Sequence, residues 1–230
     1  MVITISGEDV RHIETVLRMK IGDDLLLYDG QGTEYQVKIA HMDRSSIRTE
    51  IVSRTKREIR SPRVTLVQGL PKSDKMDMIV QKATELGVAE IIPLVTERTI
   101  VKIRDEEKRI TRWQKICREA AMQSSRIDIP WVRGVQKFQD FVASLVSHPS
   151  SLNLLPWEEG TQPIKSVLHG NEGVKNIIVL IGPEGGFSKA EAEVADEKGF
   201  YLVSLGPNIL RTETASIAVL SMILYETSPQ

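Results

Sequence analysis

The sequence predicts an α/β protein in which a domain built on a parallel sheet follows a small N-terminal β-domain. About the first 65 residues consist mainly of stretches in which β-branched or apolar residues alternate with polar ones. Residues 54–63 (RTKREIRSPR) are polar and basic and contain a proline, as is typical of a linker. Beyond them, short apolar runs alternate with helical patterns, which indicates a parallel sheet with helices on both faces. We place the two domains at residues 1–66 and 67–230.

The N-terminal domain is predicted to be a small β-barrel or a curled sheet. Glycines at residues 30 and 32, between two apolar runs, are typical of a hairpin turn. One short helix is expected over Glu8–Leu17, with Val10, Ile13, Val16 and Leu17 on one buried stripe. Strands are predicted at Val2–Ile5, Asp24–Asp29, Thr33–His41 and Ile47–Ser53.

The second domain is predicted to alternate strands with helices. Gly87 is placed to end its first helix, and Ser188 with Glu191 forms a capping box that begins a helix running to Lys198. The remaining helices are predicted at Asp74–Leu86, Asp105–Ser124, Phe138–Val146 and Thr212–Tyr225. The strands are predicted at Val64–Gly69, Ile91–Val95, Leu152–Leu155, Ile177–Ile181 and Phe200–Leu205.

The last predicted helix has almost no polar face. A helix that is apolar nearly all round must be buried, either in the core of its own chain or against a partner subunit. The apolar positions are Ile217, Ala218, Val219, Leu220, Met222, Ile223 and Leu224.

Composition excludes several classes of protein. No run approaches the roughly 20 apolar residues of a membrane span, and the N-terminus lacks the basic flank of a signal peptide. The single cysteine, Cys117, cannot form an internal disulfide, and it lies on the predicted core stripe of its helix, where packing is the simpler role than nucleophile. The four histidines show no metal-ligand spacing. We therefore expect a cytoplasmic protein without a metal site or membrane contact.

The charge is near zero overall but unevenly distributed. The formal net charge is −1. Residues 44–63 carry seven basic and two acidic side chains, and residues 98–126 carry nine and four, so each tract has a net charge of +5. Each tract is either a solvated face or part of a surface for phosphates.

Two loops near the C-terminus carry most of the functional signal. Residues 180–188 (LIGPEGGFS) and 205–215 (LGPNILRTETA) each follow an apolar run and precede a helical pattern. Strand ends that face helix starts are where open α/β sheets bind small molecules. Either loop alone is compatible with an ordinary tight turn, but together, with Glu184, Arg211 and Glu213 in them, they predict a ligand cradle.

The chemistry of the two loops restricts the ligand. Neither matches the dinucleotide fingerprint or the phosphate-binding P-loop. Glu184 in the first loop also disfavours a di- or triphosphate. A ligand that is cationic, or rich in hydroxyl and amine donors, fits better.

These loops resemble the S-adenosylmethionine-binding knot loops of the SPOUT methyltransferases, and specifically those of the RsmE family, which methylates N3 of a uridine (1498 in the usual numbering) in 16S ribosomal RNA of the small subunit. The resemblance covers nearly the whole chain. One departure is Met122, where an acidic residue is common. The supporting blocks are His12 with residues 16–18 and 20–23, residues 72–77 and 82–88, and residues 119–121, 123–124 and Arg126.

The resemblance implies a PUA-like N-terminal β-barrel and a C-terminal α/β domain with a deep trefoil knot. It also implies a homodimer packed through the knot, with the barrel of one subunit facing the cofactor of the other. The cofactor would be S-adenosylmethionine, and the partner would be 16S ribosomal RNA or the small ribosomal subunit. No metal would be required, because the methyl donor is a sulfonium.

The same resemblance assigns roles to individual residues. Arg211 and Glu213 are the candidate catalytic residues, although Arg211 could instead pair with a neighbouring Glu, and Glu184 could take the place of Glu213. The candidate cofactor-binding residues are Leu180, Gly182, Pro183, Glu184, Gly185, Gly186, Leu205, Gly206, Ile209, Leu210, Thr214 and Ala215. The candidate RNA-binding residues are Arg11, His12, Arg18, Lys20, Lys72 and Arg126; His12 alone could equally be a structural histidine.

Two other functions stay open on sequence alone. One is a SPOUT enzyme that acts on a different RNA nucleotide, and the other is an RNA-binding protein without activity. The intact glycines and residues 211–214 (RTET) favour an enzyme over the second.

Overall fold

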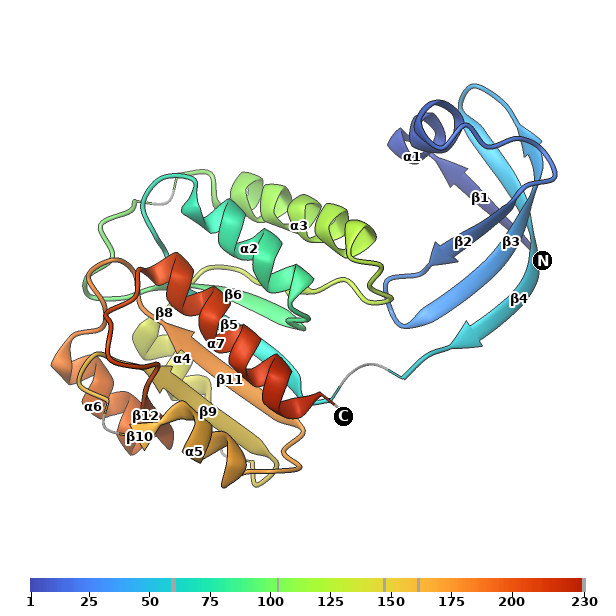
Figure 1. Cartoon of the computed structure of the whole chain (residues 1–230). Coiled ribbons are helices and arrows are strands. Elements are labelled where there is room, and N and C mark those ends of the chain that lie inside the picture. The colour runs from blue at the N-terminus through green and yellow to red at the C-terminus, as the bar shows by residue number, and fades with distance from the viewer. Residues whose placement is uncertain (59–60, 103, 147, 161, 229–230) are drawn as a thin grey trace. The chain divides into compact units, whose positions relative to one another are not determined.

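The computed structural model describes residues 1–58, 61–102, 104–146, 148–160 and 162–228. Contacts divide the chain into two compact units, residues 1–59 and 60–230, shown together in Figure 1. Strand β5 begins at Arg63, so residues 63–66, which the sequence analysis placed in the first domain, belong to a strand of the second unit.

The first unit is a four-stranded antiparallel sheet with one short helix. The strand order is β1-β4-β3-β2, and all four predicted strands are present. The buried side chains of this unit's small core are Ile5, Val10, Ile13, Ile39 and Ile47. The bounds are β1 Val2–Ser6, α1 Glu8–Arg11, the π-helical turn η1 His12–Val16, β2 Asp24–Tyr28, β3 Thr33–Met42 and β4 Ser46–Lys56.

Two expectations for this unit were wrong. Strand β4 continues through Arg54 to Lys56, residues assigned to the linker, because they pair with the start of β3; Arg54 also lies over the Tyr35 ring, at 5.6 Å from its centroid. Val16 and Leu17 are 64% and 50% exposed rather than buried. The helix widens at His12, where Leu17 N–H donates to the His12 carbonyl five residues back, and this change of pitch moves both side chains off the buried stripe.

The second unit is built on a parallel sheet, as predicted. Its strand order is β10-β12-β9-β11-β5-β6-β7, and β8 also pairs with β6. Strand β11 pairs with β9 on one side and with β5 on the other. Its carboxyl end therefore lies near the middle of the edge at which the parallel strands end. The bounds are β5 Arg63–Gly69, β6 Glu90–Val95, β7 Trp131–Val132, β8 Gln136–Lys137, β9 Ser151–Pro156, β10 Gln162–Pro163, β11 Asn176–Ile181 and β12 Phe200–Ser204.

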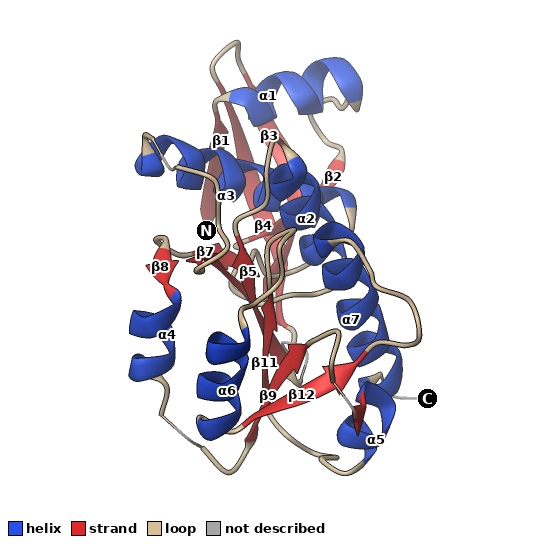
Figure 2. Ribbon diagram, turned by 90° about the vertical axis from the view of Figure 1, so that its left-hand side faces the viewer, coloured by secondary structure: helices blue, strands red, loops and turns tan. Residues whose placement is uncertain are grey.

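Helices cover both faces of this sheet (Figure 2). Helices α2, α3, α5 and α7 share one core with the sheet, and α4 and α6 share the other. The bounds are α2 Lys75–Glu85, α3 Glu106–Gln123, α4 Phe138–Ser144, α5 Ile164–His169, α6 Lys189–Glu197 and α7 Thr212–Thr227. None of the helices within the described ranges is long and apolar enough to cross a bilayer.

The sequence analysis missed only the shortest elements. Strands β7, β8 and β10 have two residues each, and α5 has six, so none shows a measurable periodicity. The predicted capping box is confirmed: Glu191 N–H donates to Ser188 Oγ, and Ser188 N–H donates to the Glu191 carboxylate.

Helix α7 is buried mainly in its own chain. Leu220 and Ile223 are 3% and 1% exposed and lie in the core shared with α2 and α5. Ile217 and Leu224 are half-buried, and Tyr225 is 82% exposed. The chain's own core therefore buries one face of α7. A second face, with Ile217, Leu224 and Tyr225, is partly apolar and is not fully buried.

Candidate functional site

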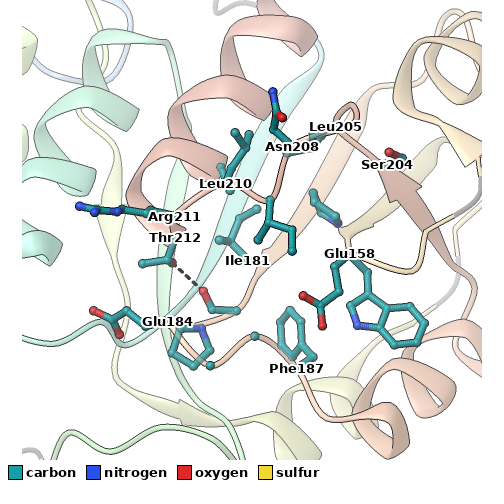
Figure 3. A pocket seen from close by; sticks show the side chains of 18 of the residues that line it. Glu158, Ile181, Glu184, Phe187, Ser204, Leu205, Asn208, Leu210, Arg211 and Thr212 are labelled. Carbon is teal, nitrogen blue, oxygen red and sulfur yellow. Dashed lines mark hydrogen bonds between the residues drawn. The ribbon is translucent and has the colours of Figure 1, made fainter.

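The two glycine- and proline-containing loops frame one cavity at the carboxyl ends of β11 and β12 (Figure 3). Its volume is about 470 Å³, enough for a ligand of small-molecule size. Of the candidate cofactor residues, those lining it are Gly182, Pro183, Glu184, Gly185, Gly186, Leu205, Gly206, Ile209, Leu210 and Ala215.

Two candidate cofactor residues do not line the cavity. Leu180 is fully buried in β11, in the core shared with α4 and α6. Thr214 is exposed on the first turn of α7.

The first loop folds tightly against itself and against the end of β5. A Cβ added to Gly182 would lie 2.9 Å from the Gly186 carbonyl carbon. A Cβ added to Gly69 would lie 2.6 Å from Pro183 Cδ. Only glycine permits both approaches, so these two positions determine how closely the 182–187 loop approaches the sheet.

A buried hydrogen-bond network joins the loops to the sheet. Gln68, fully buried in β5, donates from Nε2 to Thr212 Oγ1 at 2.9 Å. Thr212 Oγ1 in turn donates to the Gly182 carbonyl at 2.6 Å, and the interaction is drawn in Figure 3. Ser216 Oγ donates to Gln68 Oε1 at 2.5 Å. The network therefore ties β5, the first loop and the start of α7 together, and sequence reasoning found none of these links.

A second cluster, of charged side chains, lies at the edge of the cavity. Lys75 Nζ, which lines the cavity, lies 3.2 Å from a carboxylate oxygen of Glu184 and 3.2 Å from one of Glu213. The Glu184 carboxylate also accepts from Lys72 N–H at 3.0 and 3.2 Å. Lys75 begins α2, directly after a third loop that follows a strand at the same sheet edge. Its position just after a predicted strand is the sequence signal by which it could have been found.

The two bonded partners shift each other's pKa. Hydrogen bonds to Glu184 and Glu213 raise the pKa of Lys75. Burial opposes ionisation of Glu184, but main-chain N–H donors and Lys75 outweigh it and lower the pKa of that carboxyl. Because the pKa of Glu184 is lowered, its contacts stabilise the fold at pH values above the ordinary carboxyl pKa. That stabilisation is lost as the pH falls through the lowered pKa. The pair of Lys75 and Glu184 is therefore charged at neutral pH.

Arg211 lies on the rim of the cavity with its side chain exposed. In Figure 3 the guanidinium extends away from the cavity floor formed by Ile181 and Phe187. Within the described residues no carboxylate lies within 4.0 Å of it, so the alternative of a salt bridge to a neighbouring Glu is not found there. The guanidinium is available to an incoming group.

The opposite wall holds an acidic residue that sequence reasoning missed. Glu158 follows β9, and its carboxylate points into the cavity in Figure 3. The neighbouring Glu159 is exposed and does not line the cavity. The cavity thus has carboxylates on two sides, which favours a cationic or donor-rich ligand. Within the described residues, no group of three His, Cys, Asp or Glu side chains is placed to hold a metal ion.

The candidate RNA-binding residues fall into three groups. Arg11, His12, Arg18 and Lys20 are exposed on α1, η1 and the turn that follows. Lys72 lies in the second unit, beside Glu184. Arg126 is different: its side chain is 11% exposed, it donates to the Thr84 and Val88 carbonyls at 2.7 and 2.9 Å, and it pairs with Asp128. Those contacts give Arg126 a structural role, and we leave it out of the RNA contacts proposed below.

Both units match known protein families. Residues 58–224 match the model of an RNA methyltransferase domain, and residues 5–52 match that of an RNA methyltransferase PUA domain. The chain is 35% identical over 234 residues to ribosomal RNA small subunit methyltransferase E of Bacillus subtilis, covering 97% of this chain and 90% of that one. It is 35% identical over 196 residues to the Aquifex aeolicus protein of the same name, covering 84% and 82%.

A solved structure is similar over the whole chain. A ribosomal RNA small subunit methyltransferase E from Neisseria gonorrhoeae, bound to S-adenosyl methionine, superposes with a TM-score of 0.87 at 31% identity, covering 98% of this chain and 92% of that one. The α/β unit therefore has the SPOUT fold, and the first unit is PUA-like.

The buried network predicts a stability difference between two neighbouring threonines. Thr212→Val keeps the shape of the side chain but leaves the Gln68 amide and the Gly182 carbonyl without this partner. We expect the second unit to lose about 1–3 kcal/mol of unfolding free energy. Urea unfolding followed by tryptophan fluorescence measures this unit alone, because all three tryptophans lie in residues 60–230.

Thr214→Val is the matched control, since Thr214 is exposed on the same helical turn. It should change the unfolding free energy by no more than about 0.5 kcal/mol. Equal effects of the two substitutions would show that the network contributes nothing to stability.

Proposed function

The chain belongs to the RNA methyltransferase family that includes ribosomal RNA small subunit methyltransferase E, and from that membership we propose that it transfers a methyl group from S-adenosylmethionine to N3 of one uridine, 1498 in the usual numbering, in 16S ribosomal RNA. The observation that carries the proposal is the cavity framed by residues 182–187 and 205–211. As an enzyme acting on ribosomal RNA, it would work in the cytoplasm.

The chemistry of the cavity fits S-adenosylmethionine. When bound, the cofactor supplies an electrophilic methyl group on a positively charged sulfur. Glu158 on one wall and Glu184 on the other provide negative charge, and the glycine-containing loops let main-chain groups approach the adenine and ribose closely. Residues 182–187 would therefore bind mainly through their backbone.

The protein's task in the reaction is positioning and charge stabilisation. Uracil N3 is a weak acid, and it becomes a nucleophile as its proton leaves and negative charge spreads to O2 and O4. Arg211, on the rim, would stabilise that negative charge, because its guanidinium is always positively charged. As N3 bonds to the methyl carbon, the carbon–sulfur bond breaks and leaves a neutral thioether.

Glu213 is the better candidate to accept the N3 proton. Glu184 already holds Lys72 N–H and Lys75, and its pKa is lowered by these contacts. Within the described residues, the Glu213 carboxylate has one ionic partner, Lys75. Lys75 is then a positioning residue that orients both carboxylates.

The RNA would be held by both units. The target base must leave its helical stack to reach the cavity. The exposed cations Arg11, Arg18 and Lys20 with His12, in the first unit, are the proposed contacts to the RNA backbone. Mass mapping of modified nucleosides in ribosomal RNA from a deletion strain tests the target directly: an unchanged uridine N3-methylation would exclude it, and loss of another methylated nucleotide would favour the alternative substrate.

We also propose a homodimer packed through α7. The sequence left the apolar residues of this helix open to burial in the chain's own core or against a partner, and of Ile217, Leu220, Ile223 and Leu224, the second and third lie in the chain's own core. The remaining face, with half-buried Ile217 and Leu224 and exposed Tyr225, is the surface available to a second copy.

Glu158 should contribute to cofactor affinity. We expect Glu158→Gln to weaken S-adenosylmethionine binding about tenfold, because it removes a charged hydrogen-bond acceptor from the cavity wall. Titration calorimetry measures the change, and Glu159→Gln is the matched control, with wild-type affinity expected.

The neutral product S-adenosylhomocysteine distinguishes two roles. If Glu158 faces the sulfonium, only S-adenosylmethionine binding weakens in Glu158→Gln, whereas if it holds hydroxyls of the ribose, both ligands weaken. Identical affinities in Glu158→Gln and Glu159→Gln would remove Glu158 from the binding site.

Arg211 should affect rate more than cofactor affinity. We expect Arg211→Ala to lower single-turnover methylation about 10²–10³-fold, the usual cost of losing one such donor. Cofactor affinity should change by less than tenfold, under about 1.4 kcal/mol. Arg211→Lys keeps the charge but loses the planar pair of N–H donors, so its methylation rate should lie between those of the wild type and Arg211→Ala.

The pH–rate curve gives a second readout for Arg211. The rate should rise with pH and flatten once N3 is readily deprotonated, and in Arg211→Ala the plateau should move to higher pH. Equal rates in wild type and Arg211→Ala, or a defect fully explained by weaker cofactor binding, would make Glu213 or a backbone donor the next candidate.

The dimer proposal predicts different outcomes for two positions on α7. Ile217→Asp should yield a folded monomer, because the charge falls on the half-buried face. Leu220→Asp should unfold the second unit, since it places a charge in the chain's own core. Sedimentation velocity at micromolar concentration and tryptophan fluorescence report the two outcomes.

Val194→Asp is the control for the dimer test, because Val194 is an apolar residue, 38% exposed, on α6. It should leave the sedimentation coefficient at the wild-type value. A wild-type chain that sediments as a monomer would contradict the proposed dimer.

A further inference from the structure

The wall formed by Glu184 and Gly185 separates two hollows in the surface of the second unit. One is the cofactor cavity described above. The other is a groove that shares these two residues and is lined also by Lys72, Arg98 and Ile100. We call this the Arg98 groove. All five lining residues belong to residues 60–230.

Both cationic residues of the Arg98 groove are attached to the wall. Arg98 Nη1 donates to the Gly185 carbonyl at 2.8 Å. Its aliphatic stem packs on the same residue, since a Cβ added to Gly185 would lie 3.1 Å from Arg98 Cβ. Lys72 is attached through its main-chain N–H, which donates to the Glu184 carboxylate. The Lys72 attachment therefore does not use the ammonium group.

The charged ends of these two side chains remain available. In the described part of the chain, neither Lys72 Nζ nor the Arg98 guanidinium has a carboxylate partner within 4.0 Å. A guanidinium has five N–H donors, so Arg98 can hold the Gly185 carbonyl and an anion at the same time. The two cations outnumber the one carboxylate of the groove, Glu184, which is already engaged by Lys75.

The groove also contains an apolar side chain that the fold does not bury. Ile100 is 72% exposed. A single exposed isoleucine is ordinary on a protein surface, but here it shares a groove with two available cations. Proteins bind single-stranded nucleic acid with cations along the backbone and side chains, usually aromatic, against the bases. Ile100 offers an apolar contact for a base beside two cations that can hold a phosphate.

We propose that the Arg98 groove binds a nucleotide of the RNA strand adjacent to the target base, and that Arg98 couples this binding to the cofactor loop. The inference rests on the proposed function for the identity of the RNA. A phosphate held by Lys72 and Arg98 fixes the Arg98 side chain, and the Arg98–Gly185 hydrogen bond then holds the wall of the cofactor cavity. RNA and cofactor each bind more tightly when the other is present, by the same factor.

The test measures RNA binding and its coupling to a cofactor-site ligand without requiring catalysis. Fluorescence anisotropy of labelled poly(U), with and without saturating S-adenosylhomocysteine, gives both quantities. We expect Lys72→Ala, Arg98→Ala and Ile100→Ser each to weaken poly(U) binding three- to tenfold. The two cation variants should each make the log–log salt slope less steep by about 0.7, whereas Ile100→Ser should leave it unchanged. Lys165→Ala, an exposed lysine on α5, is the control and should bind as wild type.

The ratio of affinities distinguishes coupling from simple support of the loop. In wild type, S-adenosylhomocysteine should tighten poly(U) binding several-fold, and in Arg98→Ala that factor should fall to one. If Arg98 only supports the loop, Arg98→Ala weakens S-adenosylhomocysteine binding but leaves the factor unchanged, which would overturn the coupling. Lys72→Ala keeps the main-chain bond to Glu184 and should retain the factor.

Failure of the groove and failure of the proposed function give different results. If the groove variants bind poly(U) as tightly as the Lys165→Ala control, the proposed RNA site in the Arg98 groove is wrong, whatever the enzyme methylates. A wild-type protein that binds poly(U) through these residues but does not methylate undermodified small ribosomal subunits would overturn the proposed reaction and leave the groove intact.

Discussion

The hydrogen bond from Thr212 to the Gly182 carbonyl, supported by Gln68, is the interaction on which the geometry of the site depends. It joins residues 30 positions apart in the two loops, and Gln68 adds a strand 144 positions from Thr212. Thr212 and Gln68 are buried and Gly182 is half-buried, so a lost bond leaves polar groups that water replaces poorly. The contact therefore fixes both loops relative to the sheet before any ligand arrives, and it does so without occupying the cavity.

The charged cluster continues the same arrangement outward. Thr212 and Glu213 are consecutive, so the hydrogen bond that fixes Thr212 also fixes where Glu213 meets Lys75. Lys75 then holds Glu184, the residue that separates the cavity from the Arg98 groove. Hydrogen bonds between buried or half-buried neutral groups thus hold the backbone of the loops. Partly exposed ion pairs, which are weakened by water, orient the side chains at the rim.

Sequence reasoning predicted the elements well because their signals are local. The capping box at Ser188 and the ends of α3 depend on residues a few positions apart. The two loops were predicted from their glycines and prolines. Gln68 and Lys75 come from the end of β5 and the start of the helix that follows it, whereas Glu158 follows β9. They were missed as members of the site because only the sheet order brings these segments beside the two loops. The same limitation explains Leu220: a helix that is apolar nearly all round does not reveal which face meets its own core.

The position of the wall at Glu184 and Gly185 suggests why a chain with a net charge of −1 can handle a cationic cofactor and an anionic RNA side by side. On the cavity side Glu158 faces the wall, the Glu184 carboxylate is paired with Lys75, and Arg211 lies on the rim, whereas the groove side carries the cations of Lys72 and Arg98. The Glu158 carboxylate in the cavity and the two cations in the groove therefore attract ligand groups of opposite charge to the two hollows. Overall charge then says little about binding, because what each ligand meets is the local charge at the place where it binds.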